Sequence, residues 1–142
     1  MKPETALFLE KSRELLDQAE TMLEVGLNGA AGRTAYLAGF HAAQAFIFET
    51  TGRVFKRHSS VQGEFGRLVK DDPRFDTALR TFLPRAYNLK SIADYGTGPG
   101  SHVTAANAED ALQAARRFVQ CVTLLMPPNG HTPTAPTPGP KP

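Results

Sequence analysis

Apolar side chains recur at helical spacing along this chain, and no segment alternates apolar and polar residues for long enough to indicate a strand. The most regular stretch begins near Thr104, where the apolar positions form one stripe with a period of 3.6 residues. The stripe consists of Ala108, Ala111, Leu112, Ala115, Phe118, Val119, Val122 and Leu125. A helix of this kind buries its stripe against other helices. The pattern therefore predicts an all-α protein.

The same spacing predicts the remaining helices. Amphipathic helices are expected over residues 3–26 and 30–51, and a short helix is expected to begin at Ser59, which has capping-box spacing with Gln62. A further apolar stripe starts at residue 75 and is interrupted by Pro84, which should kink that helix or split it in two. These segments predict a bundle of four to five helices.

The chain length and its C-terminal composition predict one helical domain over residues 1–126. With 142 residues, the chain can bury one hydrophobic core but not two. Seven of the sixteen residues from 127 to 142 are proline, with Thr and Gly between them. Such a segment cannot bury a core, so we expect a disordered or polyproline-like tail.

Charge and cysteine content exclude several classes of protein. The net charge is only +2, so binding of nucleic acid would require a local basic patch. A single cysteine, Cys121, rules out a disulfide framework and a multi-cysteine zinc site, and we interpret it as a buried structural thiol. No histidine pair has metal-ligand spacing, so we expect neither a metal nor a cofactor. The chain also lacks a signal-peptide core and a stretch of membrane-span length, so we expect a cytoplasmic protein.

A polar cluster over residues 85–95 is the first candidate site. It places Arg85, Lys90, Asp94 and Tyr95 where a helix ends and runs into the Gly-rich loop 96–100. The loop follows a helix rather than a strand and lacks the Lys-Ser/Thr of a phosphate-binding P-loop, so we interpret it as a flexible connection. The cluster itself offers cations, a carboxylate and a phenol to a ligand.

Two histidines allow more than one interpretation. His41 borders the apolar stripe of the helix predicted over 30–51, which suits either a half-buried structural histidine or a site residue. His58 follows three cationic residues and comes before the predicted helix start. It could contribute to an anion-binding edge there, or belong to a solvated charged turn.

Three segments together resemble the HEPN family of small prokaryotic helical domains, which are often encoded beside a minimal nucleotidyltransferase. Residues 36–43 read Tyr-Leu-Ala-Gly-Phe-His-Ala-Ala and resemble the family's Tyr-x-x-x-Phe-His-Ala-Ala helix. Residues 56–61, Lys-Arg-His-Ser-Ser-Val, resemble its Thr-His-Ser-x-Val turn, and residues 90–95, Lys-Ser-Ile-Ala-Asp-Tyr, resemble its Arg-x-x-Ala-Asp-Tyr motif. The resemblance covers about residues 5–126 and implies an antiparallel bundle that forms a homodimer, with the polar motifs of both subunits in one cleft.

Active members of that family resemble metal-independent ribonucleases, in which an Arg and a His four to six residues later assist attack of the RNA 2′-hydroxyl on its phosphate. This chain departs from the pattern, because neither Arg85 nor Lys90 has a His at that distance and Lys90 replaces the expected Arg. Asp94 could accept the proton instead, or it could have a structural role, pairing with Lys90 or Arg85 and capping backbone amides. His102 in the following loop is another candidate for the missing His.

The resemblance implies an RNA-acting component of a toxin–antitoxin or related nucleotidyltransferase-linked module. We assign catalysis to Lys90, Asp94 and Tyr95, and substrate binding to Tyr36, His41, His58 and Arg85. In related modules the partner nucleotidyltransferase attaches AMP to the motif tyrosine, here Tyr95. The alternative is a non-catalytic module that binds nucleotide, RNA or the partner. A third reading is an interaction domain whose Pro-rich tail recruits other proteins.

Overall fold

The computed structural model describes residues 1–98 and 102–128, and every regular element in this part of the chain is a helix. The all-α prediction is therefore confirmed. In chain order the helices are α1 (Pro3–Glu24), α2 (Asn28–Thr51), α3 (His58–Val69), α4 (Thr77–Arg80), α5 (Phe82–Tyr95) and α6 (Ala105–Leu125).

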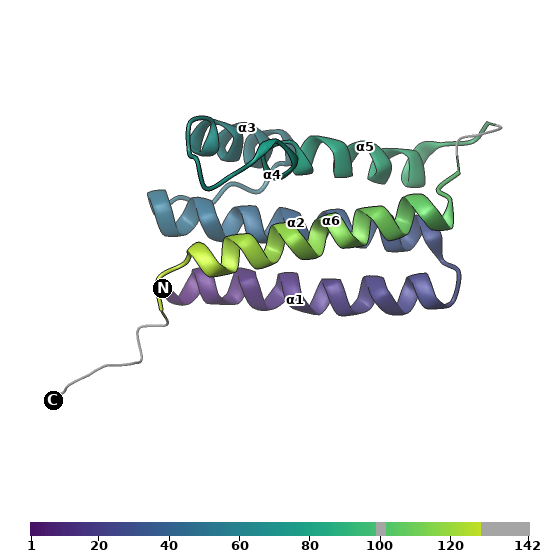
Figure 1. Ribbon diagram of the computed structural model, residues 1–142, viewed down its shortest axis with the longest axis horizontal. Helices are drawn as coiled ribbons and strands as arrows, with labels where there is room; N and C mark the ends of the chain where they lie inside the picture. Colours follow the sequence, from purple (N-terminus) through teal and green to yellow (C-terminus); the bar gives the residue numbers. More distant parts are fainter. Residues whose placement is uncertain (99–101, 129–142) are drawn as a thin grey trace, which may run out of the picture.

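Helix α2 is the centre of the bundle, because it packs against α1, α3, α5 and α6. In Figure 1, α1 and α2 run in opposite directions, as do α5 and α6, which gives the antiparallel bundle that the resemblance implied. Helices α3, α4 and α5 lie together along one side of α2, and α1 lies along the other. Side chains of α2 can therefore meet side chains of α3 and α5 on one face of the molecule.

The bundle has six helices in the described residues, one more than the upper end of the predicted number. The stretch that contains Pro84 is divided at Thr81, whose backbone (φ −100°, ψ 3°) is not helical. Pro84 lies in the first turn of α5, where a backbone N–H would have no partner within the helix. Proline therefore splits this stretch into the single turn α4 and the longer α5.

The prediction of Ser59 as the N-cap of α3 is wrong by two residues. The helix begins at His58, with Arg57 as its N-cap, and no side chain caps it. The ring of His58 packs 4.9 Å from that of Phe40 on α2, measured between centroids. This packing accounts for the earlier start and fixes His58 against α2. The predicted start of α6 is confirmed, because Thr104 is its N-cap.

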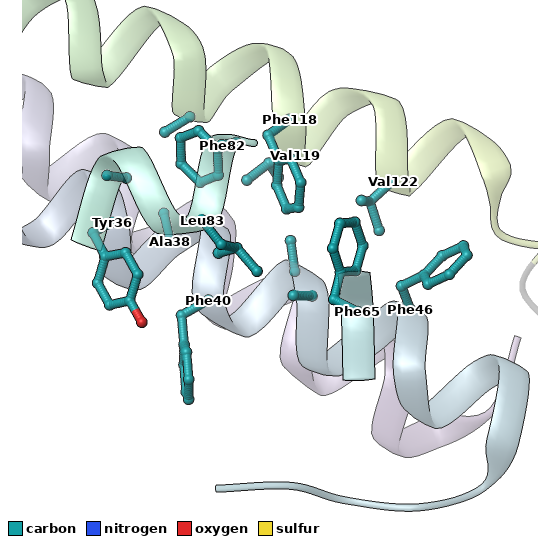
Figure 2. Close-up of a cluster of buried hydrophobic side chains, with 14 of the residues drawn as sticks. Tyr36, Ala38, Phe40, Phe46, Phe65, Phe82, Leu83, Phe118, Val119 and Val122 are labelled. Atoms are coloured by element: carbon teal, nitrogen blue, oxygen red, sulfur yellow. The ribbon is translucent and has the colours of Figure 1, made fainter. Parts of the chain in front are cut away.

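Aromatic side chains fill the core between α2, α5 and α6 (Figure 2). Phe82 of α5 stacks on Phe118 of α6, with their ring centroids 4.7 Å apart. Gly39 allows α2 to approach these rings closely, since a Cβ atom there would lie 2.1 Å from Cε2 of Phe82. This close approach sets the distance between α2 and α5, the two helices that carry most of the candidate site.

Some sequence predictions concern residues outside the described part. Residues 99–101 of the Gly-rich loop and residues 129–142 of the Pro-rich tail belong to this group. Where the described chain ends, the amino group of Met1 donates a hydrogen bond to the carbonyl oxygen of Pro128 at 2.9 Å. Within the described residues, no helix is both long and apolar enough to span a membrane.

Candidate functional site

Two cations and one carboxylate meet between α2 and α5. Lys90 and Asp94 are four residues apart on α5, which places them on one face of the helix, and their Nζ and Oδ2 atoms are 2.7 Å apart. Arg33 of α2 reaches the other carboxylate oxygen, with 3.3 Å between Nε and Oδ1. Asp94 therefore joins the two helices through their cationic side chains. We call Arg33, Lys90 and Asp94 the charged triad.

The charged triad is partly withdrawn from water. The side chain of Lys90 is only 11% exposed and that of Asp94 is 21% exposed, whereas Arg33 is 48% exposed. An ammonium group removed from water to this extent needs a partner, and Asp94 supplies it. With both cations charged, the triad carries one positive charge in excess. That excess favours the approach of an anion from the side of Arg33.

An aromatic group lies beside the charged triad. The Tyr36 side chain is completely buried on α2, and its hydroxyl lies 2.8 Å from Nδ1 of His58 at the start of α3. Figure 2 shows this hydroxyl pointing away from α6. The Tyr87 ring on α5 is 5.5 Å from the His58 ring and 5.4 Å from the Tyr36 ring, between centroids. Nζ of Lys90 is 5.6 Å from the Tyr87 centroid, so the aromatic group and the charged triad are continuous.

These surroundings set the protonation of the aromatic group. Burial lowers the pKa of His58 below its ordinary value of 6.5, and the nearby charges of Lys90 and Arg33 lower it further. Burial raises the pKa of Tyr36 to about 12. At neutral pH, His58 is therefore uncharged and Tyr36 keeps its proton. A neutral imidazole next to these groups can accept a proton, and the two cations can attract a phosphate to the same place.

The structure brings together four of the seven residues that the sequence assigned to the site: Tyr36, His58, Lys90 and Asp94. Tyr36 lies beneath His58 and has no exposed surface, so it can act only through its neighbours. Among the described residues, the other three have different surroundings. Whether they bind or react with a substrate stays a prediction.

His41 faces a different part of the surface. Its Nδ1 atom lies 2.7 Å from Oε1 of Gln44, and it lines a shallow apolar hollow with Phe8, Lys11 and Val54. Burial lowers the pKa of His41, and Lys11 lowers it further, while the bond to Gln44 opposes this. These contacts fit the half-buried structural histidine that was one of its two interpretations.

Arg85 and Tyr95 also lie apart from the charged triad. Arg85 lines a groove between α5 and α6, together with Asp110 and away from Lys90. Tyr95 is the last residue of α5, and its side chain is 78% exposed. Arg85 could therefore contact a ligand only on another surface, whereas Tyr95 is freely accessible to a second protein.

Comparison with known proteins agrees with the motif order. A family model described as "HEPN domain" matches residues 5–125. This chain belongs to the HEPN family. Among solved structures, the crystal structure of TT1696 from Thermus thermophilus is similar to this HEPN chain, with a TM-score of 0.69 and 22% sequence identity over 87% of this chain and 98% of that one. At that identity the likeness shows the fold. A search of the curated proteins gave no match.

Sequence reasoning did not assign Arg33 and Tyr87 to the site of this HEPN chain. Tyr87, Lys90 and Asp94 are spaced i, i+3 and i+7, which is one face of a helix, so this spacing could have identified Tyr87. Arg33 is harder to find. It joins the site only because α2 packs against α5, and a single sequence does not encode that placement visibly.

Two further groups bear on the chemistry that this HEPN chain can perform. Among the described residues, no cluster of three or more His, Cys, Asp or Glu side chains could hold a metal ion. Cys121 is half-buried, and burial raises the pKa of its thiol. A thiol with a raised pKa is a poor nucleophile, as expected for a structural cysteine. The candidate site therefore has cations, a phenol, an imidazole and a carboxylate as its reactive groups.

Proposed function

We propose that this HEPN protein acts on RNA at the charged triad and cleaves it without a metal ion. The observation that carries the proposal is the convergence of Arg33 and Lys90 on Asp94, next to a neutral His58. RNA phosphates bind cations with release of counterions, and Arg33 is exposed enough to meet one. Cleavage by the 2′-hydroxyl needs a cation for the charge that develops on the phosphate, together with a proton acceptor.

A cleavage assay tests the proposal. Single-stranded RNA and total transfer RNA are incubated with the full chain in the presence of a chelator, and product ends are identified by mass spectrometry. The expected result is chelator-resistant cleavage that leaves 2′,3′-cyclic phosphate ends. Lys90→Met, which keeps the length and apolar packing of the side chain, should lower the rate by roughly 10²-fold, because a preorganised charge at the transition state is lost.

Lys70→Met is the matched control, since Lys70 is an exposed lysine that follows α3 and lies outside the charged triad. Both variants should have native-like circular dichroism and cooperative unfolding. Cleavage that is unaffected by Lys90→Met would contradict the proposal. A folded native protein that neither binds nor cleaves RNA would also contradict it.

A second candidate function is a non-catalytic module that binds RNA or nucleotide. The close pairing of Lys90 with Asp94 favours it, because the ammonium group is already engaged and largely withdrawn from solvent. The absence of a motif histidine after Lys90 favours it as well. Calorimetry with nucleotides and with uncleavable 2′-O-methyl RNA would show saturable binding, while the cleavage assay shows no product.

The proposal extends to a partner. HEPN domains are often encoded beside a minimal nucleotidyltransferase in two-gene toxin–antitoxin modules. We propose that this chain has a nucleotidyltransferase partner of that kind, which attaches AMP to Tyr95. The side chain of Tyr95 is 78% exposed at the end of α5, so a second active site can reach its hydroxyl. In this step the phenolic oxygen forms a bond to the α-phosphorus of ATP, pyrophosphate leaves, and the phenolic proton passes to solvent.

Mass spectrometry after incubation with a minimal nucleotidyltransferase encoded beside this chain and with ATP tests the modification. The native chain should gain one AMP, and Tyr95→Phe should gain none. Tyr87 serves as an internal control because its ring packs within the aromatic group. AMP found at Tyr87, or an unmodified Tyr95, would remove this part of the proposal.

A homodimer is also part of the proposal, on the basis of family resemblance. Light scattering should return about twice the chain mass of 15.4 kDa. A particle of 15.4 kDa would mean that the charged triad acts within one chain and shares no cleft with a second copy.

A further inference from the structure

The residue that accepts the proton in the proposed cleavage is not provided by the motif of this chain. Positions 94–97, where a histidine would follow Lys90, hold Asp, Tyr, Gly and Thr. Asp94 is engaged by Lys90 and Arg33 together, which commits its two oxygens to ion pairs. The imidazole next to this site is that of His58, which comes from a different helix.

His58 is connected to the charged triad through its aromatic neighbours. Its ring lies 5.5 Å from the ring of Tyr87, and the Lys90 ammonium lies 5.6 Å from the same Tyr87 ring. Lys90 and Arg33 are also close enough to lower the pKa of His58 through their charges. His58 is half-buried rather than enclosed, so part of the residue is exposed to solvent.

The Nδ1 edge of the His58 ring is fixed by a hydrogen bond to Tyr36. Nδ1 lies 2.8 Å from the Tyr36 hydroxyl, and the Gln62 side chain lowers the pKa of that hydroxyl, against the larger effect of burial. Gln62 is one helical turn after His58 on α3, while Tyr36 is on α2 and completely buried. A buried phenol whose pKa is about 12 stays neutral, so the Tyr36 hydroxyl can both donate and accept a hydrogen bond.

We propose that His58 is the catalytic proton acceptor of this protein, replacing the missing motif histidine, and that Tyr36 is a positioning residue that orients it. The inference rests on the proposed RNA cleavage and assigns the group that performs its proton transfer. In the reactive arrangement, Nδ1–H donates to the Tyr36 oxygen. Nε2 then presents its lone pair to the ligand.

The step is balanced without water or a metal ion. The ribose 2′-hydroxyl gives its proton to Nε2 of His58 while the 2′-oxygen forms a bond to the adjacent phosphorus. The bond from phosphorus to the 5′-oxygen of the next nucleotide breaks, and that oxygen takes a proton back from the imidazolium. The products are a 2′,3′-cyclic phosphate and a 5′-hydroxyl. Lys90 and Arg33 stabilise the charge that develops on the phosphate oxygens.

The charges around His58 keep it ready for this role. Lys90 from α5 and Arg33 from α2 both favour its neutral form, and the buried phenol of Tyr36, whose pKa is raised to about 12, carries no charge at neutral pH. Asp94 opposes the two cations but is itself paired with them. Cleavage should therefore require the neutral imidazole, and its rate should fall as the pH drops below the lowered pKa of His58.

The test compares His58→Ala with the native full chain on a fluorescently labelled single-stranded RNA across a pH series, with chelator present. His58→Ala should lower the cleavage rate by roughly 10²- to 10⁴-fold, should abolish the acid limb of the pH profile, and should regain activity with added imidazole. Binding of 2′-O-methyl RNA should change by less than about threefold, since the phosphate-binding cations remain. His102→Ala, a histidine in the loop before α6, is the matched control and should cleave as the native chain does.

Tyr36→Phe tests the positioning role. It keeps the buried ring and removes only the hydroxyl that orients His58. We expect a lower cleavage rate and an unchanged RNA affinity. The acid limb of the pH profile should still be present, but at a different pH. Thr123→Val is the control, because it removes a hydroxyl that hydrogen-bonds the Val119 carbonyl oxygen within α6.

The outcomes separate this assignment from the proposed function. Chelator-resistant cleavage that survives His58→Ala in folded protein, or an acid limb that persists in that variant, overturns the role of His58 and leaves the proposed function standing. Loss of activity with His102→Ala alone also overturns it. A native chain that binds RNA without cleaving it overturns both and supports the non-catalytic module.

Discussion

Lys90 is a buried cation, and its stability depends on one carboxylate. If Asp94 neutralises it, the paired substitutions Lys90→Met and Asp94→Asn should be coupled by about 1–2 kcal/mol in the free energy of unfolding. Asp94→Asn alone should be the more destabilising of the two, because it leaves the ammonium without its partner at 2.7 Å. Urea unfolding of the four proteins in a double-mutant cycle measures the coupling.

The pair Glu64 and Arg67 on α3 is the control for this cycle. It has the same 2.7 Å separation between nitrogen and oxygen, but the side chain of Arg67 is 66% exposed. Water screens an exposed pair, so its coupling should be clearly weaker than that of Lys90 and Asp94. Equal coupling in the two pairs would mean that Lys90 gains nothing from its burial beside Asp94.

Stability should fall on acidification because of two histidines. The pKa values of His41 and His58 are both lowered in the folded chain, mainly by burial. The unfolded chain therefore binds protons first, near the ordinary pKa of 6.5, and the folded state loses stability as the pH falls through and below that value. Urea unfolding at about pH 7.5 and about pH 5.5 should show this loss.

Replacing one histidine should reduce the loss. His58→Asn and His41→Asn each remove one group whose folded pKa is lowered, so each should show a smaller change in stability between the two pH values than the native chain. A variant that shows the full native change would indicate that its histidine titrates normally when folded.

The residue scale also shows what a single sequence reveals about this site. Lys90 and Asp94 could be predicted, because their spacing on one helix brings them together without tertiary information. The Tyr36–His58 bond could not, because it joins residues 22 positions apart on separate helices. Arg33 was missed for the same reason. The Lys90–Asp94 pair, one of the alternatives that the sequence left open for Asp94, lies within a single helical turn.

At the scale of elements, a Cβ atom added to a helical glycine would meet a neighbouring helix at some positions and open space at others. Gly39→Ala should destabilise the fold by about 1–3 kcal/mol, because its Cβ would lie 2.1 Å from a Phe82 ring that is itself stacked on Phe118. Gly66→Ala, on the exposed face of α3 with no atom within 4 Å of the added Cβ, should stabilise by roughly 0.5–1 kcal/mol. Chemical denaturation of both variants measures the two opposite signs.

Destabilisation by both substitutions would show that α3 does not hold a plain helical conformation at Gly66. A neutral Gly39→Ala would show that Phe82 moves freely. Because Gly39 sets the approach of α2 to α5, its substitution should also weaken RNA cleavage, while Gly66→Ala should leave it unchanged.

Helix α6 begins at a side-chain cap. The Thr104 hydroxyl oxygen accepts a hydrogen bond from the backbone N–H of Asn107 at 3.0 Å. Thr104→Ala should therefore cost about 1 kcal/mol of unfolding free energy, and Thr104→Ser should restore most of it because it keeps the acceptor. Thermal unfolding of the two variants checks the difference, and equal melting temperatures would show that the cap contributes nothing.

The beginnings and ends of helices were predictable where local chemistry decides them. Thr104 before α6 and Gly52 after α2, which adopts φ 74°, are signals that act within a few residues. The start of α3 was not predictable in this way. His58 is drawn into the helix by its packing on Phe40 and its bond to Tyr36, and tertiary contacts of this kind override a capping-box pattern.

For the whole molecule, helical periodicity was enough to predict the fold class, and the order of three motifs was enough to indicate the family. The arrangement of the helices required the structure, because the same stripes could pack in several orders. The arrangement of the helices matters for function because α2, the centre of the bundle, contributes Arg33 to the charged triad and Tyr36 to the aromatic group. Stability of the bundle and geometry of the site are therefore linked.

This link leads to a prediction about the C-terminal tail. The hydrophobic core consists of residues between Leu9 and Val122, and the charged triad and aromatic group lie between residues 33 and 94. A chain that ends at residue 128 keeps all of these residues and the contact between Met1 and Pro128. It should unfold at the same urea concentration as the full chain and should cleave RNA at the same rate. If truncation leaves stability unchanged but reduces cleavage, the proline-rich segment contributes to RNA binding. If truncation instead reduces stability, that segment packs on the bundle, and the domain does not end at residue 126.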